Sequence, residues 1–284
     1  MKVLLIGVNG YVGYELYNYL INKKIEVVGV DNFLRKDINK KIDNTLVSDY
    51  INLDQGFLDQ FTDCIWLSGY SSVKQASENP RDALEVNLIN LINFRHRFNG
   101  RFIYASSGSV YSKKKPEVCD ELSETSTPMN MYDYTKISFD NYLIASNLNG
   151  IGLRFGTVNG PGENIKRDLM INSMVYDAVL KKEIYVMNSE YYRPILSITD
   201  LINGIYKILN SDIKTGIYNM CSFNSSIGDI ANEVSRNLNV KLIDRGSKLT
   251  YNFLMDSSKF QNDFNFKFEL KIEDIIQELK KYYE

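Results

Sequence analysis

The start of the chain carries the feature that most restricts its fold, a short apolar run followed at once by three spaced glycines. Lys2–Ile6 is the kind of continuous apolar stretch that forms a central parallel strand buried on both faces. Gly7, Gly10 and Gly13 follow it and open a helical pattern that continues through Ile21. Glycines there permit a tight turn, close approach of backbone amides to a pyrophosphate, and close packing of the helix on the strand. This order of strand, glycines and helix predicts a dinucleotide site.

An acidic residue at the end of the next strand indicates which dinucleotide is bound. The strand expected at Glu26–Val30 ends in Asp31, eighteen residues after Gly13. An acid near this position binds the adenosine ribose hydroxyls of NAD and repels the 2′-phosphate of NADP. Arg35 and Lys36 lie only a few residues further on, so NADP is disfavoured without being excluded. The sequence therefore predicts NAD as the cofactor.

Strands and helices continue to alternate along the first half of the chain. Further strands are expected at Thr45–Val47 and Cys64–Leu67, and a helix from about Pro80 to Arg97. Asp49 follows the first of these strands, where it would either accept a hydrogen bond from an adenine amine or cap a turn. The alternation predicts an α/β fold with a doubly wound parallel sheet.

Two later stretches carry groups suited to acid/base chemistry. The β-forming run Phe102–Tyr104 is expected to end in a polar loop, Ala105–Gly108, and ligands lie at the carboxyl ends of such strands. Tyr132 and Lys136 are one helical turn apart, so both project from one face, and the ammonium is expected to lower the phenol's pKa from about 10. Ser107 would polarise the same substrate oxygen. Tyr-x-x-x-Lys also arises by chance in a chain with 20 tyrosines. It becomes evidence for an active site because the serine-rich strand end and the glycines are independent observations that point to the same site.

Composition and charge exclude several classes of protein. The 284 residues are 44% hydrophobic and 24% charged, as in an ordinary globular protein, and the net charge of −2 gives no reason to expect nucleic-acid or membrane binding. No apolar run approaches the roughly 18 residues of a membrane span. Cys64, Cys119 and Cys221 are widely spaced, which argues against a disulfide framework and against a metal site. The single histidine, His96, lies at an expected helix end. We expect a cytoplasmic protein without a metal.

Several motifs in the right order give the chain a family resemblance over nearly its whole length. Ser106–Tyr111 resembles the Ser-Ser-x-x-Val-Tyr-Gly motif of the extended short-chain dehydrogenases/reductases, with Ser112 in place of the glycine. Asp256–Lys259 is similar to that family's closing Asp-x-Ser-Lys. The family contains NAD-dependent nucleotide-sugar epimerases and dehydratases. The resemblance implies a Rossmann-type NAD-binding domain at residues 1–158 and a smaller, interwoven substrate lobe at 159–284, with segments near 192–210 returning to the first.

The resemblance also implies roles for individual residues. Ser107, Tyr132 and Lys136 correspond to the family's catalytic trio. The implied cofactor-binding residues are Gly7, Asn9, Gly10, Tyr11, Val12, Gly13, Asp31, Asn32, Asp49, Tyr50, Leu67, Ser68, Gly69, Asn87, Tyr132, Lys136 and Phe155. The implied substrate-binding residues are Ser107, Ser109, Thr157, Asn172, Arg193 and Arg245. Arg193 would clamp a substrate phosphate, whereas Asn172 would either bond the diphosphate or cap a helix turn.

Three functions are compatible with these implied roles. The first is epimerisation or oxidation of a nucleotide sugar by hydride transfer at a carbinol carbon, C4, with Tyr132 as acid/base. The second is reduction of a 4-keto sugar nucleotide by external NADH or NADPH, and the third is a non-catalytic dinucleotide sensor. Dehydratases of this family carry an acidic pair where this chain has Gly108 and Ser109, so dehydration is not expected.

Apolar residues on two of the expected helices predict a homodimer. They are more numerous than one sheet-facing stripe requires, and a helix that is apolar on two sides needs a second surface to cover it. Members of the family commonly pair through these helices. The alternative is that all of them face the sheet or the substrate lobe. The residues are Leu84, Leu88, Leu91, Ile92, Ile137, Phe139, Tyr142 and Leu143.

Overall fold

A single large parallel sheet forms the centre of the molecule. The computed structural model describes residues 1–35, 37–111 and 117–284, so Lys36 and Ser112 lie outside the described residues. The seven strands of the sheet are all parallel and have the order β11-β7-β5-β4-β1-β2-β3. They are β1 (Lys2–Ile6), β2 (Glu26–Asp31), β3 (Leu46–Val47), β4 (Asp63–Trp66), β5 (Arg101–Ser107), β7 (Ile151–Phe155) and β11 (Gly216–Met220). The predicted doubly wound α/β fold is confirmed.

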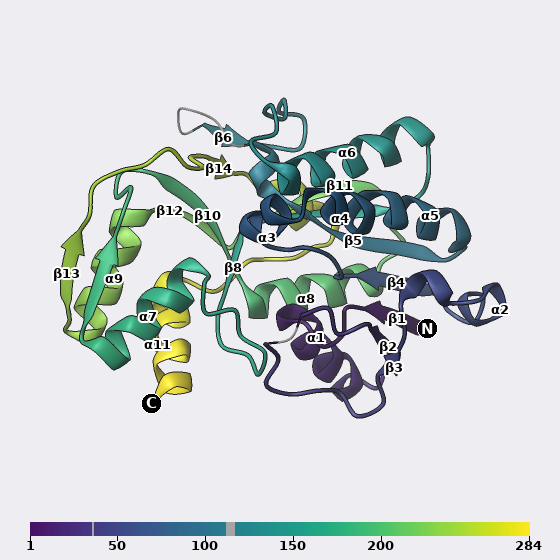
Figure 1. The fold of residues 1–284 in the computed structure, drawn as a ribbon, viewed down its shortest axis with the longest axis horizontal. Coiled ribbons are helices and arrows are strands. Elements are labelled where there is room, and N and C mark those ends of the chain that lie inside the picture. The colour runs from purple at the N-terminus through teal and green to yellow at the C-terminus, as the bar shows by residue number, and fades with distance from the viewer. Residues whose placement is uncertain (36, 112–116) are drawn as a thin grey trace.

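The two faces of the sheet are covered by different helices, as Figure 1 shows. Successive side chains of β1 point to opposite faces, which explains why the whole run is apolar. Val3 and Leu5 belong to the core shared with α1 (Tyr11–Asn22) and α8 (Ile198–Leu209), whereas Leu4 and Ile6 belong to the core shared with α5 (Asn90–Arg97) and α6 (Met131–Ser146).

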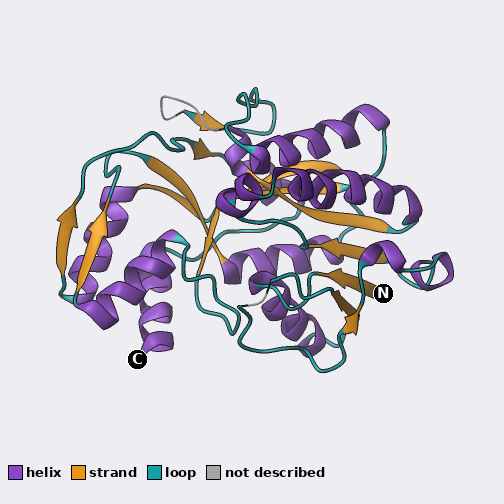
Figure 2. Ribbon diagram, in the orientation of Figure 1, coloured by secondary structure: helices purple, strands orange, loops and turns teal. Residues whose placement is uncertain are grey.

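A second lobe lies beside the large sheet (Figure 2). It contains a three-stranded sheet of order β12-β10-β8 and the parallel pair β13-β9. The strands are β8 (Thr157–Asn159), β9 (Glu183–Val186), β10 (Tyr192–Ser197), β12 (Phe223–Ser226) and β13 (Lys241–Asp244). The helices are α7 (Met170–Lys181), α9 (Ile227–Leu238) and α11 (Ile272–Tyr283). The chain returns to the large sheet with α8 and β11 between two strands of this lobe, which is why the two parts are interwoven.

Short elements complete the described part of the chain. They are η1 (Tyr50–Asn52), α2 (Gln55–Leu58), α3 (Val73–Glu78), α4 (Pro80–Leu84), η2 (Glu85–Ile89), η3 (Gly108–Tyr111), β6 (Val118–Cys119), β14 (Leu254–Met255) and α10 (Ser258–Asp263). Within the described ranges, no helix combines the length and the apolar character that crossing a bilayer requires.

Two sequence predictions about these elements are wrong. The strand expected to end before Ala105 continues as β5 through Ser107, because its last residues still pair with β7. The single helix expected over 80–97 consists of α4, a π-helical turn at η2 and α5. Such turns often occur at functional sites. This one carries Asn87, whose side chain is bonded to the backbone of Tyr70 rather than exposed on a regular helix.

Most of the residues expected at a subunit contact are buried inside the subunit. Leu88, Leu91, Ile137, Phe139 and Leu143 are each at most 9% exposed, so the expectation that they form an outer apolar surface is wrong for these five. Four of them pack on the sheet around Phe102 and Tyr104, so the sheet of the same subunit covers them and no second subunit is needed for this. Leu84, Ile92 and Tyr142 are partly buried, and the exposed large hydrophobic residues of these helices are Ile89, Tyr134 and Ile144.

Candidate active site

The predicted acid/base groups meet where β5 and α6 lie next to each other. Ser107 ends β5 and is buried, and Tyr132 and Lys136 lie on successive turns of α6. The Asn130 side chain caps α6 by accepting from the amide of Asp133 at 3.0 Å, which fixes where the helix begins. The Lys136 ammonium donates to the carbonyl of Ala105 at 2.7 Å and lies 5.7 Å from the Tyr132 ring centre. The structure therefore brings the three groups together as the sequence predicted.

The ionisation of the phenol differs from the sequence prediction. Burial raises the pKa of Tyr132, and the neighbouring Ser107 hydroxyl only partly opposes this. Burial also lowers the pKa of the Lys136 ammonium, to about 8. The prediction that Lys136 lowers the tyrosine's pKa is wrong here because the ammonium donates to Ala105. A preformed phenolate is therefore disfavoured by the surroundings of Tyr132.

Four further polar side chains form a hydrogen-bonded group beside Ser107: Ser109, Asn130, Asp133 and Tyr251. The Ser109 hydroxyl lies 2.9 Å from that of Ser107 and donates to Asp133 at 2.7 Å. Tyr251, from the substrate lobe, donates to the same carboxylate at 3.0 Å. The side chain of Asn130 donates to the carboxylate at 2.8 Å. Asp133 therefore joins α6 to the second lobe.

The glycine-rich turn has the geometry of a dinucleotide site. Gly7 has φ +85°, and a Cβ there would lie 2.9 Å from the amide nitrogen of Ser68. A Cβ on Gly13 would lie 2.2 Å from the carbonyl oxygen of Gly7, so only glycine allows helix α1 to pack this closely on the turn. Gly10 begins the helix without a side-chain cap, which leaves the first amides for an anion. The residues present fit the diphosphate of a dinucleotide.

The end of β2 is arranged for an unphosphorylated ribose. The Asp31 carboxylate accepts from the amides of Asn9 and Phe33, each at 2.8 Å, and so lies beside the glycine-rich turn. The Arg35 guanidinium, the group suited to a 2′-phosphate, pairs with Asp37 at 2.9 Å and donates to the carbonyl of Asn164 at 2.9 Å. Because these contacts occupy Arg35, the structure adds to the case for NAD.

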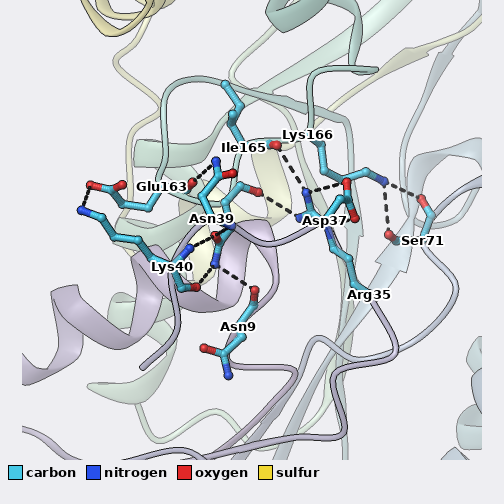
Figure 3. Close-up of polar contacts among 10 residues, drawn as sticks. Asn9, Arg35, Asp37, Asn39, Lys40, Ser71, Glu163, Ile165 and Lys166 are labelled. Atoms are coloured by element: carbon cyan, nitrogen blue, oxygen red, sulfur yellow. Dashed lines mark hydrogen bonds and ion pairs between the residues drawn. The ribbon is translucent and has the colours of Figure 1, made fainter. Parts of the chain in front are cut away.

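Two segments meet across the glycine-rich turn, and we call Arg35, residues 37–40 and residues 163–166 together the clasp (Figure 3). Asn164 is fully buried and joins them. Its Oδ1 accepts from the amides of Asn39 and Lys40 at 2.8 and 2.9 Å, and its Nδ2 donates to the carbonyls of Asn9 and Lys40 at 3.0 and 2.8 Å. Lys166 extends the contact to Ser71 at 3.3 Å. The clasp ties the NAD-binding part of the chain to the loop that leads into the substrate lobe.

The residues predicted to bind the substrate lie in different surroundings. Arg193 is half-buried, donates to Thr250 at 3.1 Å, and has a pKa lowered to about 10, chiefly by burial. Thr157 is also half-buried, on β8. Asn172 is fully buried; it accepts from the amide of Gly160 at 2.9 Å and donates to the carbonyl of Lys166 at 3.0 Å, so those bonds hold a turn. Arg245 is exposed and stacks on the Tyr185 ring at 3.8 Å.

Comparison with known proteins places this site in a family. The model of the family described as "NAD dependent epimerase/dehydratase family" matches residues 3–221. The chain belongs to this family. Its cofactor is NAD. The uncharacterized protein MJ1055 of Methanocaldococcus jannaschii is 29% identical over 248 residues, which are 77% of this chain and 75% of that protein.

Solved structures of this epimerase/dehydratase type have the same fold. The UDP-glucose 4-epimerase of Thermotoga maritima, solved with UDP-glucose, has a TM-score of 0.87 at 15% identity and covers 100% of this chain and 98% of its own. The NAD-dependent NDP-hexosamine 5,6-dehydratase TunA has a TM-score of 0.87 at 18% identity, with 99% and 97% covered. At these identities the likeness shows the fold alone.

The other predicted cofactor residues surround the turn of this epimerase/dehydratase fold. Asn87 bonds the backbone of Tyr70 at 2.8 and 3.0 Å, which shapes the loop after β4. Asp49 caps η1 by accepting from Ile51 at 3.2 Å, as one of its two interpretations predicted. The remaining ones lie on the turn and α1, at the ends of β2 and β4, on η1 and at the end of β7: Asn9, Tyr11, Val12, Asn32, Tyr50, Leu67, Ser68, Gly69 and Phe155. Their contacts with a cofactor stay predictions.

Sequence reasoning missed four residues of this site: Asp133, Tyr251, Asn164 and Lys166. An acid inside Tyr-Asp-Tyr-Thr-Lys was a visible signal for Asp133, because the residue after the tyrosine lies on the same first turn of the helix. Tyr251 and Asp133 are 118 residues apart, and no local pattern connects them. The clasp depends in the same way on contacts between distant loops.

Proposed function

We propose that the protein is an NAD-dependent epimerase that acts on a nucleotide-activated sugar, with hydride transfer at a sugar carbinol carbon, C4. The observation that carries the proposal is the meeting of Ser107, Tyr132 and Lys136 at the carboxyl ends of strands that also hold the glycine-rich turn. A phenol, a hydroxyl and an ammonium beside a dinucleotide are the groups that hydride exchange at an alcohol requires.

The chain's own residues handle the proton while the bound NAD supplies the acceptor and donor of the hydride. Tyr132 exchanges the proton of the sugar hydroxyl, and Ser107, at the end of β5, helps to hold that oxygen's developing charge. Lys136 bonds the cofactor ribose and keeps the end of β5 in place through Ala105. Gly10 and the first amides of α1 hold the diphosphate, and Asp31 holds the ribose hydroxyls.

Arg193 supports the proposal that the sugar carries a diphosphate. Its hydrogen bonds in the structure are to neutral oxygens, those of Tyr192 and Thr250, and its guanidinium lies 5.9 Å from the Tyr251 ring centre. Taking a cation out of water without a neutralising group is unfavourable, as its lowered pKa reflects. A diphosphate would supply that charge through the bidentate geometry that guanidinium favours. Nucleotide-sugar binding in the Thermotoga maritima epimerase agrees with this assignment.

The second candidate is a 4-keto-sugar reductase, which would use the same three groups. It must exchange its cofactor in every turnover, whereas an epimerase recovers NAD in the site. The clasp across the glycine-rich turn favours a resident cofactor and therefore the epimerase. A dehydratase is less favoured because Gly108 and Ser109 carry no carboxyl group. The nearby carboxyl group of Asp133 accepts a hydrogen bond from the Ser109 hydroxyl.

The deciding experiment starts with the cofactor that stays with the purified protein. The protein is denatured, the released dinucleotide is identified by mass spectrometry, and UDP-, GDP-, dTDP- and CDP-sugars are then screened for conversion without added cofactor. An epimerase interconverts two sugars with no net change in NADH absorbance. Stoichiometric consumption of added NAD(P)H would instead identify the reductase. Stable NAD binding without conversion of any sugar would identify a dinucleotide sensor.

We also propose that the protein is a homodimer. Ile89 and Ile144 are 46% and 65% exposed on helices that flank the same face of the sheet. Exposed apolar side chains on one face are covered when that face meets its own copy across a two-fold axis.

A further inference from the structure

Tyr251 lies between two groups of the candidate active site. It belongs to residues 250–252, which form neither helix nor strand and lead to β14. Its ring packs against a small buried cluster that includes Ile137 of α6. Its hydroxyl bonds α6, and the guanidinium of Arg193 lies 5.9 Å from its ring centre. One side chain of the second lobe is therefore next to both the helix that carries Tyr132 and the cation assigned to the diphosphate.

The hydroxyl of Tyr251 holds the two residues that bracket Tyr132. Asn130 caps α6, and Asp133 is the third residue of the helix and is only 1% exposed. The hydroxyl oxygen accepts from the side-chain amide of Asn130 at 2.7 Å, and its proton goes to the Asp133 carboxylate at 3.0 Å. Asn130 also donates to that carboxylate at 2.8 Å. The three side chains therefore form a closed set of hydrogen bonds around the turn that contains Tyr132.

The first turn of a helix depends on such contacts, because its amides have no partners on a preceding turn. The amide of Asp133 donates to the Asn130 side chain at 3.0 Å, and the amide of Tyr134 donates to the Asn130 carbonyl at 3.0 Å. Both bonds require that Asn130 stays in place, and the Tyr251 hydroxyl is one of the groups that hold it. A shift of about 1 Å in a reacting group can slow a reaction about 100-fold. Contacts that fix this turn therefore fix the reaction geometry at Tyr132.

The ring of Tyr251 serves the other part of the substrate. The guanidinium of Arg193 lies over this ring, within the roughly 6 Å typical of a cation–π contact. Arg193 also donates to the hydroxyl oxygen of Thr250 at 3.1 Å. The side-chain oxygen of Asn252 accepts from the amide of Tyr192, the residue before Arg193, at 2.9 Å. Three consecutive residues therefore hold Arg193 and its strand from one side.

We propose that Tyr251 is a positioning residue for both ends of the substrate: its hydroxyl fixes Tyr132 at the sugar carbon, and its ring fixes Arg193 at the diphosphate. The inference rests on the proposed function, which assigns the sugar proton to Tyr132 and the diphosphate to Arg193. Tyr251 acts on the substrate only through these two residues. Its two effects are separable, because Tyr251→Phe removes the hydroxyl alone and Tyr251→Leu removes the ring as well.

The first test examines the helix turn without a substrate. Amide hydrogen exchange is followed by NMR in the NAD-loaded protein. In Tyr251→Phe the amides of Asp133 and Tyr134 should exchange roughly 10- to 100-fold faster, as expected when a hydrogen bond to a charged group is lost, and the amide of Asp140, further along α6, should keep its rate. Tyr282→Phe, at an exposed tyrosine of α11, is the control and changes none of them. Unchanged exchange at Asp133 and Tyr134 in Tyr251→Phe overturns the role of the hydroxyl.

The second test measures by calorimetry how tightly the NAD-loaded protein binds UDP, or the nucleoside diphosphate of the sugar nucleotide that the screen identifies. This ligand carries the diphosphate without the sugar, so its affinity reports on Arg193 and not on Tyr132. Tyr251→Phe keeps the ring and should bind the diphosphate as the wild type does. Tyr251→Leu should bind it roughly 2- to 30-fold more weakly, the range for a lost cation–π contact. Wild-type affinity in a folded Tyr251→Leu variant overturns the role of the ring.

The third test uses turnover of the sugar nucleotide that the screen identifies. Tyr251→Phe should lower kcat roughly 10- to 100-fold with KM nearly unchanged, whereas Tyr251→Leu should also raise KM. In a Tyr132→Phe background, Tyr251→Phe should cause no further loss, because no phenolic oxygen remains to be positioned. A general structural role of Tyr251 would lower the residual rate in that background as well. Such a fall, or wild-type kcat in a folded Tyr251→Phe variant, overturns the proposal.

These outcomes separate the positioning role from the proposed function. If the wild type converts no sugar nucleotide, the proposed function fails, and hydrogen exchange still decides whether Tyr251 fixes the first turn of α6. If the wild type converts a sugar nucleotide and Tyr251→Phe changes neither exchange nor kcat, the positioning role alone fails. If Tyr251→Leu does not fold, Tyr251→Met carries the binding test, because methionine keeps a long side chain without a ring.

Discussion

Replacement of Asn164 by alanine should convert a protein that retains its NAD into one that releases it. The side chain is fully buried and makes four hydrogen bonds, to the backbone of Asn9, Asn39 and Lys40. Removal of a buried partner costs about 1–3 kcal/mol for each group left unsatisfied. Water reaches some of these groups once the clasp loosens, which reduces the total. We therefore expect the free energy needed to open the clasp to fall by about 1.4–2.8 kcal/mol. Since 1.4 kcal/mol is a factor of about ten, NAD release should accelerate about 10- to 100-fold.

The assay measures cofactor release directly. Bound NADH is displaced by excess NAD, and the decay of its fluorescence gives the dissociation rate for the wild type and for Asn164→Ala. Asn232→Ala serves as the matched control, because this asparagine is exposed on α9, outside the clasp. Circular dichroism and the midpoint of thermal unfolding show whether the variant is folded. A folded Asn164→Ala protein that releases NADH at the wild-type rate would refute the role of the clasp.

Four further outcomes are expected. Tyr132→Phe keeps the ring but loses the proton-transferring oxygen, so turnover should fall by roughly 10²–10⁴ while NAD binding survives; near-normal turnover would contradict the catalytic assignment. NAD should bind more tightly than NADP because Asp31 would face the 2′-phosphate, and calorimetry showing the reverse order would remove Asp31 from the ribose site. The pKa of Lys136 is lowered from 10.5 to about 8 by burial, so the unfolded chain binds more protons between these values, and the free energy of unfolding should gain a contribution as the pH rises through this window. Urea titrations should show that Lys136→Met flattens the rise, and an equal slope in both proteins would contradict the shift. Light scattering at micromolar concentration should give twice the 32.7 kDa subunit mass, and a value that stays at the subunit mass would contradict the dimer formed through Ile89 and Ile144.

Much of the fold follows from local patterns. The apolar run Lys2–Ile6 had to be buried on both faces, and the sheet places its alternate side chains in two different cores. The glycine spacing predicted a turn that no residue with a Cβ could make, and the contacts of Gly7 and Gly13 agree. Ligands lie at the carboxyl ends of parallel strands, which allowed Ser107 and Tyr132 to be assigned to one site although they are 25 residues apart, and the bond from Lys136 to Ala105 joins their elements.

Ionisation could not be predicted in this way. The four-residue spacing of Tyr132 and Lys136 places both on one helix face, but it does not say whether the ammonium reaches the phenol. In the structure the carbonyl of Ala105 takes the ammonium, because β5 continues past the point where its apolar residues end. Burial then decides the direction of both pKa shifts.

The sequence by itself predicted the strands of the sheet, the dinucleotide turn and the Tyr132–Lys136 pair, because each depends on residues within a few positions of one another. Only the tertiary structure decided what surrounds them. The carboxyl group of Asp133 meets Tyr251 across 118 residues, and Asn164 meets Asn9 across 155. Such contacts form when the chain packs. Their contribution to the free energy of folding depends on burial and on which hydrogen-bond partners each polar group has. No local periodicity contains that information.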